Sequence, residues 1–109
     1  MNLKNFKIDD QGRIEYEGTK PAIVDFWAEW CPPCKVMGPI FAEAAKVYGD
    51  RIDFYKVDVD KESKTSQEFA IRGVPAFYFV NPNKFVTIHV GTMTQEELYE
   101  IIENKLLGE

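Results

Sequence analysis

The chain has 109 residues, of which 45% are hydrophobic, and a net charge of −5. This length fits one domain, and this composition is enough to form a buried core. The negative charge argues against nucleic acid and anionic membranes as partners. No apolar run approaches the roughly 20 residues that cross a bilayer, and the N-terminal sequence MNLKNFKIDD has no signal-peptide core. We therefore expect a cytoplasmic protein, or a periplasmic one if a leader has been removed.

The first 19 residues carry the weakest pattern. Two short extended pieces, FKI and RIEYE, are separated by the turn residues Asp10, Gln11 and Gly12. The next segment, PAIVDFWA at residues 21–28, is a nearly continuous apolar run. It predicts a central strand that is covered on both faces.

An amphipathic helix is predicted after residue 31, because hydrophobic residues recur at spacings of three and four. Gly49 should end this helix, and Pro39 should kink it, because proline removes one hydrogen bond from the ladder. The apolar face consists of Val36, Met37, Ile40, Phe41, Ala44, Ala45 and Tyr48.

Residues 53–60, DFYKVDVD, alternate as a second strand, with Tyr55, Val57 and Val59 on one side. The succession of strand, helix and strand predicts a right-handed βαβ unit with parallel strands. A shorter polar helix is expected over residues 61–71.

That shorter helix should present Phe69 and Ala70 inward, and Gly73 and Pro75 should break the chain after it. Strands at 76–80 and 85–90 follow. Their connection is so short that they must form an antiparallel hairpin.

Thr94 and Glu97 have the spacing of a capping box, which predicts the start of a last helix. Its hydrophobic stripe comprises Leu98, Ile101, Ile102 and Leu106. The complete pattern predicts an α/β fold in a single domain, with a central mixed β-sheet flanked by helices on both faces.

The two cysteines, Cys31 and Cys34, follow the central strand at the start of a helix. A loop this short constrains little of the unfolded chain, so a structural disulfide is not expected. Zinc is not expected either, because His89 is the only histidine that could join the two sulfurs as a ligand. The spacing favours a redox couple over two inert buried cysteines.

A cysteine at a helix start faces free amides and the positive end of the dipole, and both favour the thiolate. Cys31 is therefore the expected nucleophile, and Cys34 the sulfur that resolves the mixed disulfide. Prolines at the first helical positions are well tolerated there, and the amides of Cys34 and Lys35 can still reach the Cys31 sulfur.

Asp25 places a carboxyl group inside the apolar strand, where desolvation raises its pKa. It can then act as a general acid/base toward Cys34 through a water molecule. The alternative is an aspartate on a solvated edge. Lys56, on the neighbouring predicted strand, either tunes Asp25 or is simply solvated.

In order and spacing, the pieces VDFWAEWC, CK, Pro39, KVDVD, IRGVP and VG resemble the thioredoxin family over residues 20–107. The resemblance implies the thioredoxin fold and protein disulfide reductase activity. It identifies Cys31 as the nucleophile, Cys34 as the resolving cysteine, Asp25 as the buried aspartate and Lys56 as the lysine beside it.

The resemblance also implies which partners the chain has. These are client proteins with disulfides and a flavin-dependent thioredoxin reductase that uses NADPH. No bound cofactor or metal is implied, because the redox group is the Cys31–Cys34 disulfide itself. The sequence carries no oligomer signal, and we expect a monomer.

Pro75 resembles the family's cis-proline, which faces the cysteines and lets a client backbone pair with Val74. Further residues match the substrate groove or stand beside the cysteines: Trp30, Pro32, Pro33, Val59, Gly73, Val90, Gly91 and Thr92.

Two features depart from the family pattern. Residues 1–19 lack a recognisable amphipathic first helix, and the usual WCGPC motif is WCPPC here. Pro32 removes an amide donor and restricts the reduced loop, and both effects predict a couple at least as reducing as about −270 mV. Strain between Pro32 and Pro33 acts in the opposite direction. The sign of the net effect is left open.

Three functions compete. The leading interpretation is a general reductant of protein disulfides. The second is a periplasmic relative with dedicated clients; such proteins often carry an insertion between the helix and the next strand, and this chain has none. The third is a docking module without electron transfer, which would need neither the cysteine pair nor Asp25.

Overall fold

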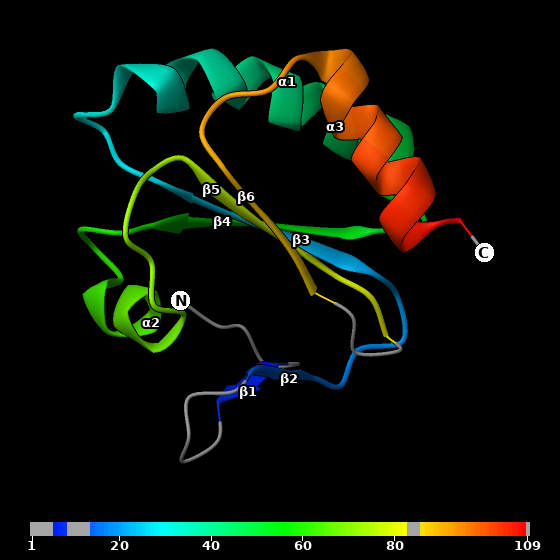
Figure 1. Ribbon diagram of the computed structural model, residues 1–109, viewed down its shortest axis with the longest axis horizontal. Coiled ribbons are helices and arrows are strands. Elements are labelled where there is room, and N and C mark those ends of the chain that lie inside the picture. Colours follow the sequence, from blue (N-terminus) through cyan, green and yellow to red (C-terminus); the bar gives the residue numbers. More distant parts are fainter. Residues whose placement is uncertain (1–5, 9–13, 83–85, 109) are drawn as a thin grey trace.

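The computed structural model describes residues 6–8, 14–82 and 86–108. Its centre is a four-stranded sheet with the order β4-β3-β5-β6 (Figure 1). The strands are β3 (Ala22–Trp27), β4 (Asp53–Asp58), β5 (Ala76–Val80) and β6 (Val86–Val90). β3 pairs with β4 in parallel, whereas β5 runs antiparallel to both β3 and β6. The predicted mixed sheet, its βαβ unit and its hairpin are confirmed.

Helices cover both faces of this sheet, as predicted. Helix α1 (Pro32–Tyr48) and helix α3 (Gln95–Ile101) lie on one side, and α2 (Ser63–Glu68) lies on the other (Figure 1). Helix α3 continues as a short π-helix, η1 (Ile102–Leu106). Strand β4 ends two residues earlier than the sequence suggested.

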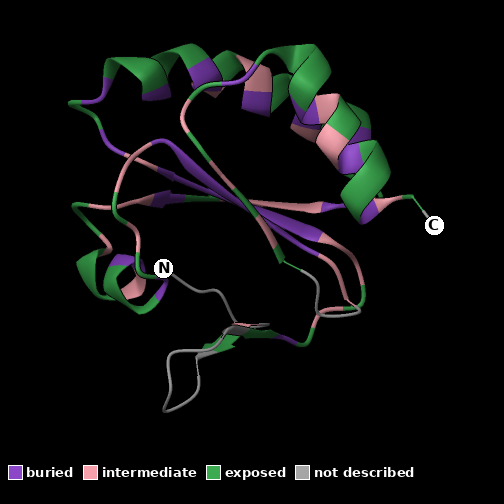
Figure 2. Cartoon of the chain, in the orientation of Figure 1, coloured by how far each residue is buried: buried purple, intermediate pink, exposed green. Residues whose placement is uncertain are grey.

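Two hydrophobic cores form, one on each side of the sheet, and β3 contributes to both. Ile23 packs into the core under α1 and α3, while Val24 and Phe26 pack into the core on the α2 side. Residues 22–26 are all buried. Figure 2 shows buried positions concentrated in β3 and β5 and on the helix faces turned toward the sheet. The prediction of a central strand covered on both faces is confirmed.

The helix ends follow local signals. Gly49 is the C-cap of α1, and Pro39 lies inside that helix. At α3, the Thr94 amide donates to Glu97 Oε1 at 2.9 Å, and the Glu97 amide donates to Thr94 Oγ1 at 3.1 Å. The predicted capping box is therefore confirmed.

Helix α2 is shorter than predicted, and one of its two inward residues was assigned wrongly. Phe69 is buried, but Ala70 is exposed with a φ of 57°. The Ala70 amide donates to Gln67 O and the Ile71 amide to Ser66 O. This is a Schellman motif with alanine at the left-handed position that glycine usually takes. The helix therefore stops at Glu68, and Ala70 turns outward.

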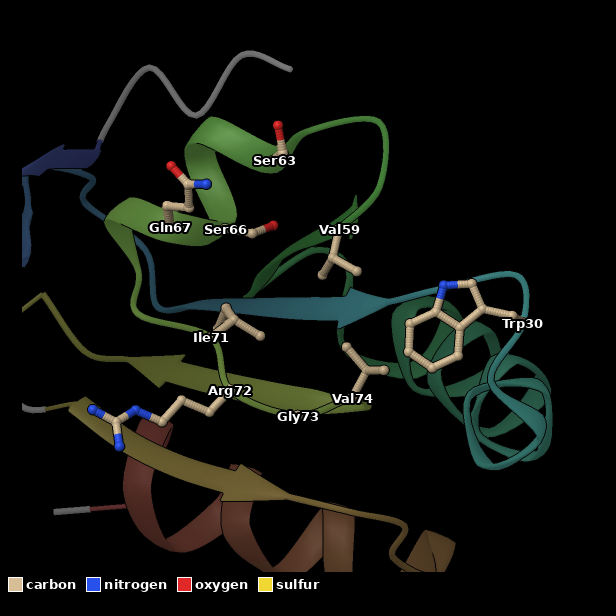
Figure 3. A pocket seen from close by; sticks show the side chains of 9 residues that line it. All are labelled: Trp30, Val59, Ser63, Ser66, Gln67, Ile71, Arg72, Gly73 and Val74. Carbon is tan, nitrogen blue, oxygen red and sulfur yellow. The ribbon is translucent and has the colours of Figure 1, made fainter.

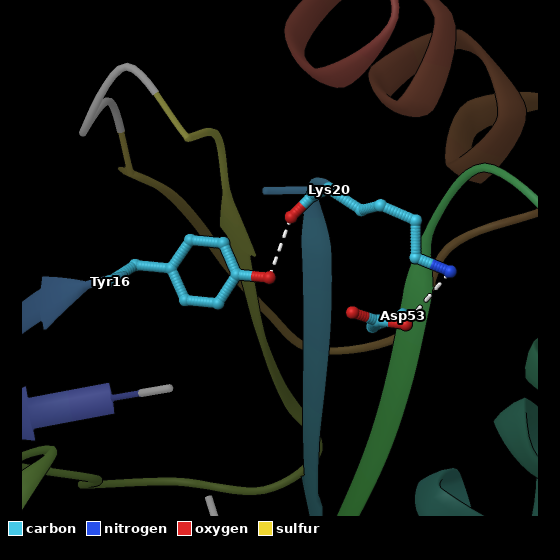
Figure 4. Close-up of polar contacts among 3 residues, drawn as sticks. All are labelled: Tyr16, Lys20 and Asp53. Carbon is cyan, nitrogen blue, oxygen red and sulfur yellow. Dashed lines mark hydrogen bonds and ion pairs between the residues drawn. The ribbon is translucent and has the colours of Figure 1, made fainter. Parts of the chain in front are cut away.

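The N-terminal segment forms a separate two-stranded sheet, made of β1 (Phe6–Ile8) and β2 (Ile14–Tyr16). The two predicted extended pieces are thus confirmed, while the predicted turn at residues 10–12 lies outside the described residues. Tyr16 is buried, and its hydroxyl donates to Lys20 O at 2.6 Å (Figure 4). The Lys20 ammonium pairs with Asp53 at 3.2 Å. These contacts connect the hairpin to the start of β3 and β4.

Replacing Ala70 with glycine should stabilise the protein. A left-handed conformation is less favourable for an L-residue than for glycine by about 1 kcal/mol. We expect Ala70→Gly to raise the free energy of unfolding by about 0.5–1 kcal/mol, measured by urea denaturation. Ala42→Gly, an exposed site inside α1, is the matched control and should lower it by about 1 kcal/mol. Equal destabilisation by both changes would contradict this account of α2.

Candidate functional site

The two cysteines lie where the chain leaves β3 and enters α1. Cys31 is the N-cap of the helix, and Cys34 lies in its first turn. They form a disulfide with a Cα–Cα distance of 5.3 Å. Both are buried in a small cluster with Ala28, against which Val59 and Val74 pack. The sulfurs therefore sit in apolar surroundings at the positive end of a helix.

One backbone amide reaches the Cys31 sulfur. The Cys34 amide donates to Sγ at 3.2 Å. The Lys35 amide, which the sequence suggested as a second donor to sulfur, donates to the Cys31 carbonyl oxygen at 3.3 Å instead. That expectation was wrong because the carbonyl of the N-cap residue accepts the first bond of the helix.

The prolines occupy the first two helical positions, Pro32 at N1 and Pro33 at N2. An N-cap side chain accepts from the amide at N2 or N3. Here the amide of Cys34, at N3, donates that hydrogen bond. The other position that could donate is N2, where Pro33 has no N–H. An N–H at Pro32, position N1, would not donate to the sulfur.

The segment that precedes β5 lies against the cysteines. The Val74–Pro75 peptide bond is cis, the isomer that the family resemblance implied for Pro75. Val74 O lies 3.6 Å from Cys31 Sγ, within reach of an S–H donor when the disulfide is reduced. Gly91, with a φ of 104°, donates its amide to Pro75 O at 2.8 Å. That φ value favours glycine. The hydrogen bond holds the end of β6 against Pro75.

Asp25 is buried, with 3% of its surface exposed, so the alternative of a solvated edge residue is wrong. Burial raises the pKa of its carboxyl from 3.8 to about 7, and the charge of Lys56 opposes this rise. Its Oδ1 atom has no hydrogen-bond partner among the described residues.

Lys56 lies opposite Asp25 in the parallel register of β3 and β4. Its side chain is exposed, and its ammonium lies 4.8 Å from the centre of the Trp27 ring. Both predicted alternatives for Lys56 thus hold in part, because a solvated lysine still acts on the Asp25 carboxyl.

A groove runs beside the cysteines. Trp30 is 67% exposed, and its indole N–H donates to Asp60 Oδ2 at 2.7 Å, which fixes the ring. Trp30, Val59, Gly73 and Val74, all predicted groove residues, line one cavity of about 320 Å³ (Figure 3). The same cavity has five further lining residues that sequence reasoning missed: Ser63, Ser66, Gln67, Ile71 and Arg72.

Val90 lines a second cavity, of about 390 Å³, together with Gly73. Thr92 lines neither cavity, and its carbonyl oxygen contacts His89 Nε2 at 3.1 Å. Pro32 and Pro33 are exposed next to the cysteines. Five of the ten predicted groove residues thus line one or both of these cavities.

Neither a metal centre nor a membrane span is found in the part of the chain that the structure describes. No group of three or more metal-ligating side chains occurs among those residues. None of the helices in this part is both long and apolar enough to cross a membrane.

The sequence was compared with protein families and known proteins. The thioredoxin family model matches residues 9–104. The chain belongs to the thioredoxin family. A thioredoxin of Borreliella burgdorferi is 37% identical over 106 residues, which cover 97% of this chain and 90% of the relative. A thioredoxin of Malassezia sympodialis is 44% identical over 81 residues, covering 72% and 77% of the two chains.

Solved thioredoxin structures agree with the fold. The Malassezia sympodialis thioredoxin superimposes with a TM-score of 0.70 at 41% identity, covering 78% of this chain and 74% of that one. The Drosophila thioredoxin Deadhead gives a TM-score of 0.72 at 28% identity, covering 80% and 82%. The chain thus has the thioredoxin fold and is a thiol–disulfide oxidoreductase, whose redox group is its own cysteine pair.

The buried Asp25 carboxyl makes stability depend on pH. Its pKa is about 7 in the folded chain, against a usual 3.8. Between these values the folded state holds more protons at Asp25 than the unfolded state, so the contribution of Asp25 to stability is greatest below about pH 4 and falls as the pH rises to 7. At about 1.4 kcal/mol per pKa unit, the loss is about 4 kcal/mol.

We expect Asp25→Asn, which carries no charge, to raise the free energy of unfolding by about 2–4 kcal/mol at pH 8 and by little at pH 4. Urea denaturation of the oxidised protein at both pH values measures this. The exposed Asp50 provides the control, and Asp50→Asn should have a small effect that does not change with pH. A pH-independent effect of Asp25→Asn would contradict the assignment.

The two prolines should differ in their effect on the pKa of the Cys31 thiol. Pro33→Ala restores the N2 amide and should lower the pKa of the Cys31 thiol by about one unit, the lower range of a charge-assisted hydrogen bond. Pro32→Ala should leave this pKa within about 0.3 units, because N1 does not donate to the N-cap side chain. The pH dependence of Cys31 alkylation by iodoacetamide measures both. An equal shift in the two variants would contradict the capping geometry.

Proposed function

We propose that this thioredoxin reduces disulfides of client proteins, with Asp25 as the acid/base for Cys34. The observation that carries the proposal is the environment of the Cys31 sulfur. This sulfur accepts a hydrogen bond from the Cys34 amide at a helix N-terminus. It also lies next to Val74, at one end of an apolar groove. The helix amide favours the thiolate, and the groove offers a surface where a client can bind beside it.

The reaction proceeds in two exchanges. The Cys31 thiolate attacks one sulfur of the client disulfide, the client S–S bond breaks, and the other client sulfur leaves as a thiolate. Cys34 then attacks Cys31 Sγ, the Cys31–Cys34 disulfide forms, and the second client sulfur leaves. The client gains two electrons and this chain loses two.

Asp25 moves the proton that the second exchange requires. With a pKa of about 7, its carboxylate can take the proton of the Cys34 thiol near neutral pH and return it to a leaving client thiolate. The unpartnered Oδ1 atom provides a free acceptor, reached through a water molecule. The positive charge of Lys56 lowers the pKa of the Asp25 carboxyl and so opposes the effect of burial.

Reduction of the disulfide completes the cycle. We assign this step to a flavin-dependent thioredoxin reductase that draws electrons from NADPH, the donor that family membership suggests.

The link between α1 and β4 spans only residues 49–52, without the insertion typical of relatives with dedicated clients. This favours a general reductant over the client-specific alternative.

Insulin reduction tests the proposal. Wild-type chain with dithiothreitol should reduce insulin disulfides much faster than Cys34→Ser does. Cys34→Ser that has been reduced and freed of dithiothreitol should accumulate a mixed disulfide with insulin at Cys31, because no second sulfur resolves it. Cys31→Ser is the control and should form no mixed disulfide. If neither the wild type nor Cys34→Ser reduces insulin, the docking module is the surviving function.

A further inference from the structure

We propose that Arg72 selects client segments that carry an acidic side chain beside an apolar one. The acidic side chain pairs with Arg72, and the apolar side chain fills the cavity between residues 70–73 and β6. This inference rests on the proposed function and names the substrate class of the same site.

Arg72 stands at the junction of two cavities. It lines the cavity of about 320 Å³ next to Trp30 and also the cavity of about 390 Å³ next to β6. Among the described residues that line these two cavities, Arg72 alone is charged. Figure 3 shows its side chain extending away from Trp30 and along strands β5 and β6. A client segment that occupies both cavities therefore lies beside Arg72.

The guanidinium is available for a partner. Arg72 is exposed, and within the described ranges it forms no ion pair or hydrogen bond from its side chain. Arg51 differs, since it lies 5.1 Å from the centre of the Tyr48 ring and 3.8 Å from an Asp50 oxygen. An arginine without a protein partner in an apolar groove is suited to a carboxylate of a bound segment.

The cavity next to β6 provides the apolar half of the site. Ile88 and Val90 line it and are 54% and 62% exposed. They pair with Tyr78 and Ala76 of β5, which places all four side chains on the α2 side of the sheet. The apolar surface of the core on that side thus continues onto β6, where it is left uncovered and continuous with the groove beside the cysteines.

Charge is distributed unevenly along the groove. Asp60 binds the Trp30 indole at one end, and Arg72 lies at the other. The net charge of −5 repels an acidic client at long range. That field is screened beyond about 8 Å at physiological ionic strength, whereas a contact with Arg72 is not. Acidic side chains should therefore help only at the position that reaches Arg72.

The backbone fixes that position. Arg72 lies two residues before Val74, whose carbonyl oxygen is 3.6 Å from Cys31 Sγ, so the guanidinium is attached to the chain at a fixed place relative to the reactive sulfur. The preferred acidic side chain should thus stand at one constant spacing from the client cysteine that reacts with Cys31.

A peptide series tests this inference. The peptides contain one disulfide and are identical except for Glu, Gln or Lys at one position, moved through the four residues on either side of the reactive cysteine. We expect kcat/KM for Glu to exceed that for Gln by about two- to fivefold at one position, the range of an exposed ion pair. Arg72→Gln should remove this preference, and Arg72→Glu should reverse it in favour of Lys. Lys64→Gln, an equal charge change at an exposed α2 residue, should retain it.

The apolar half is tested with Ile88→Ser. It should lower kcat/KM for the preferred peptide by about two- to fivefold, whereas Val47→Ser, at an exposed valine on α1, should not. Equal kcat/KM for Glu, Gln and Lys at every position would overturn the inference, as would a preference that survives Arg72→Gln. Reduction of 2-hydroxyethyl disulfide, small and uncharged, is measured in parallel. If the wild type does not turn it over, the proposed function fails instead.

Discussion

Hydrophobic packing on both faces of β3 fixes the depth and the direction of the strand on which the site depends. Ile23 is held in one core while Val24 and Phe26 are held in the other, so β3 cannot shift without exposing one set. The same burial removes water from Asp25, which lies between them in sequence, and raises its pKa. Strand β3 then delivers the chain to Cys31 at the start of α1. The raised pKa of Asp25 and the position of Cys31 thus share one structural cause.

The helix start explains how a double proline is compatible with a hydrogen bond to the Cys31 sulfur. Capping requires one amide, and the amide of Cys34 supplies it from the third helical position. Pro32 and Pro33 fill two positions whose amides have no partner inside the helix. The lost donors are therefore unequal: only the one at Pro33 belongs to a position that can serve the sulfur. The departure from WCGPC at Pro32 acts through the freedom of the chain rather than through hydrogen bonding.

Where the signals are local, the sequence was sufficient. The apolar run of β3, the periodicity of α1 and the Thr94–Glu97 capping box are each read from residues close together in the sequence. All three are confirmed. The end of α2 was missed because its left-handed position carries Ala70 in place of glycine. Arg72 was missed because its role depends on two cavities formed by distant parts of the chain. The Lys35 amide was misassigned because spacing does not distinguish the Cys31 sulfur from its carbonyl.

Within the residues that the structure describes, β1 and β2 form no ladder hydrogen bonds to the central sheet and belong to a separate sheet. Aromatic packing of Phe6 against Tyr55 and Phe69 joins the hairpin to the rest of the molecule, together with the hydrogen bond from Tyr16 to Lys20. Detachment of β1 and β2 therefore breaks side-chain contacts and leaves β3 paired on both edges. The hairpin is a subdomain that can open alone, and its amide hydrogens should exchange with solvent well before those of the strand that carries Asp25.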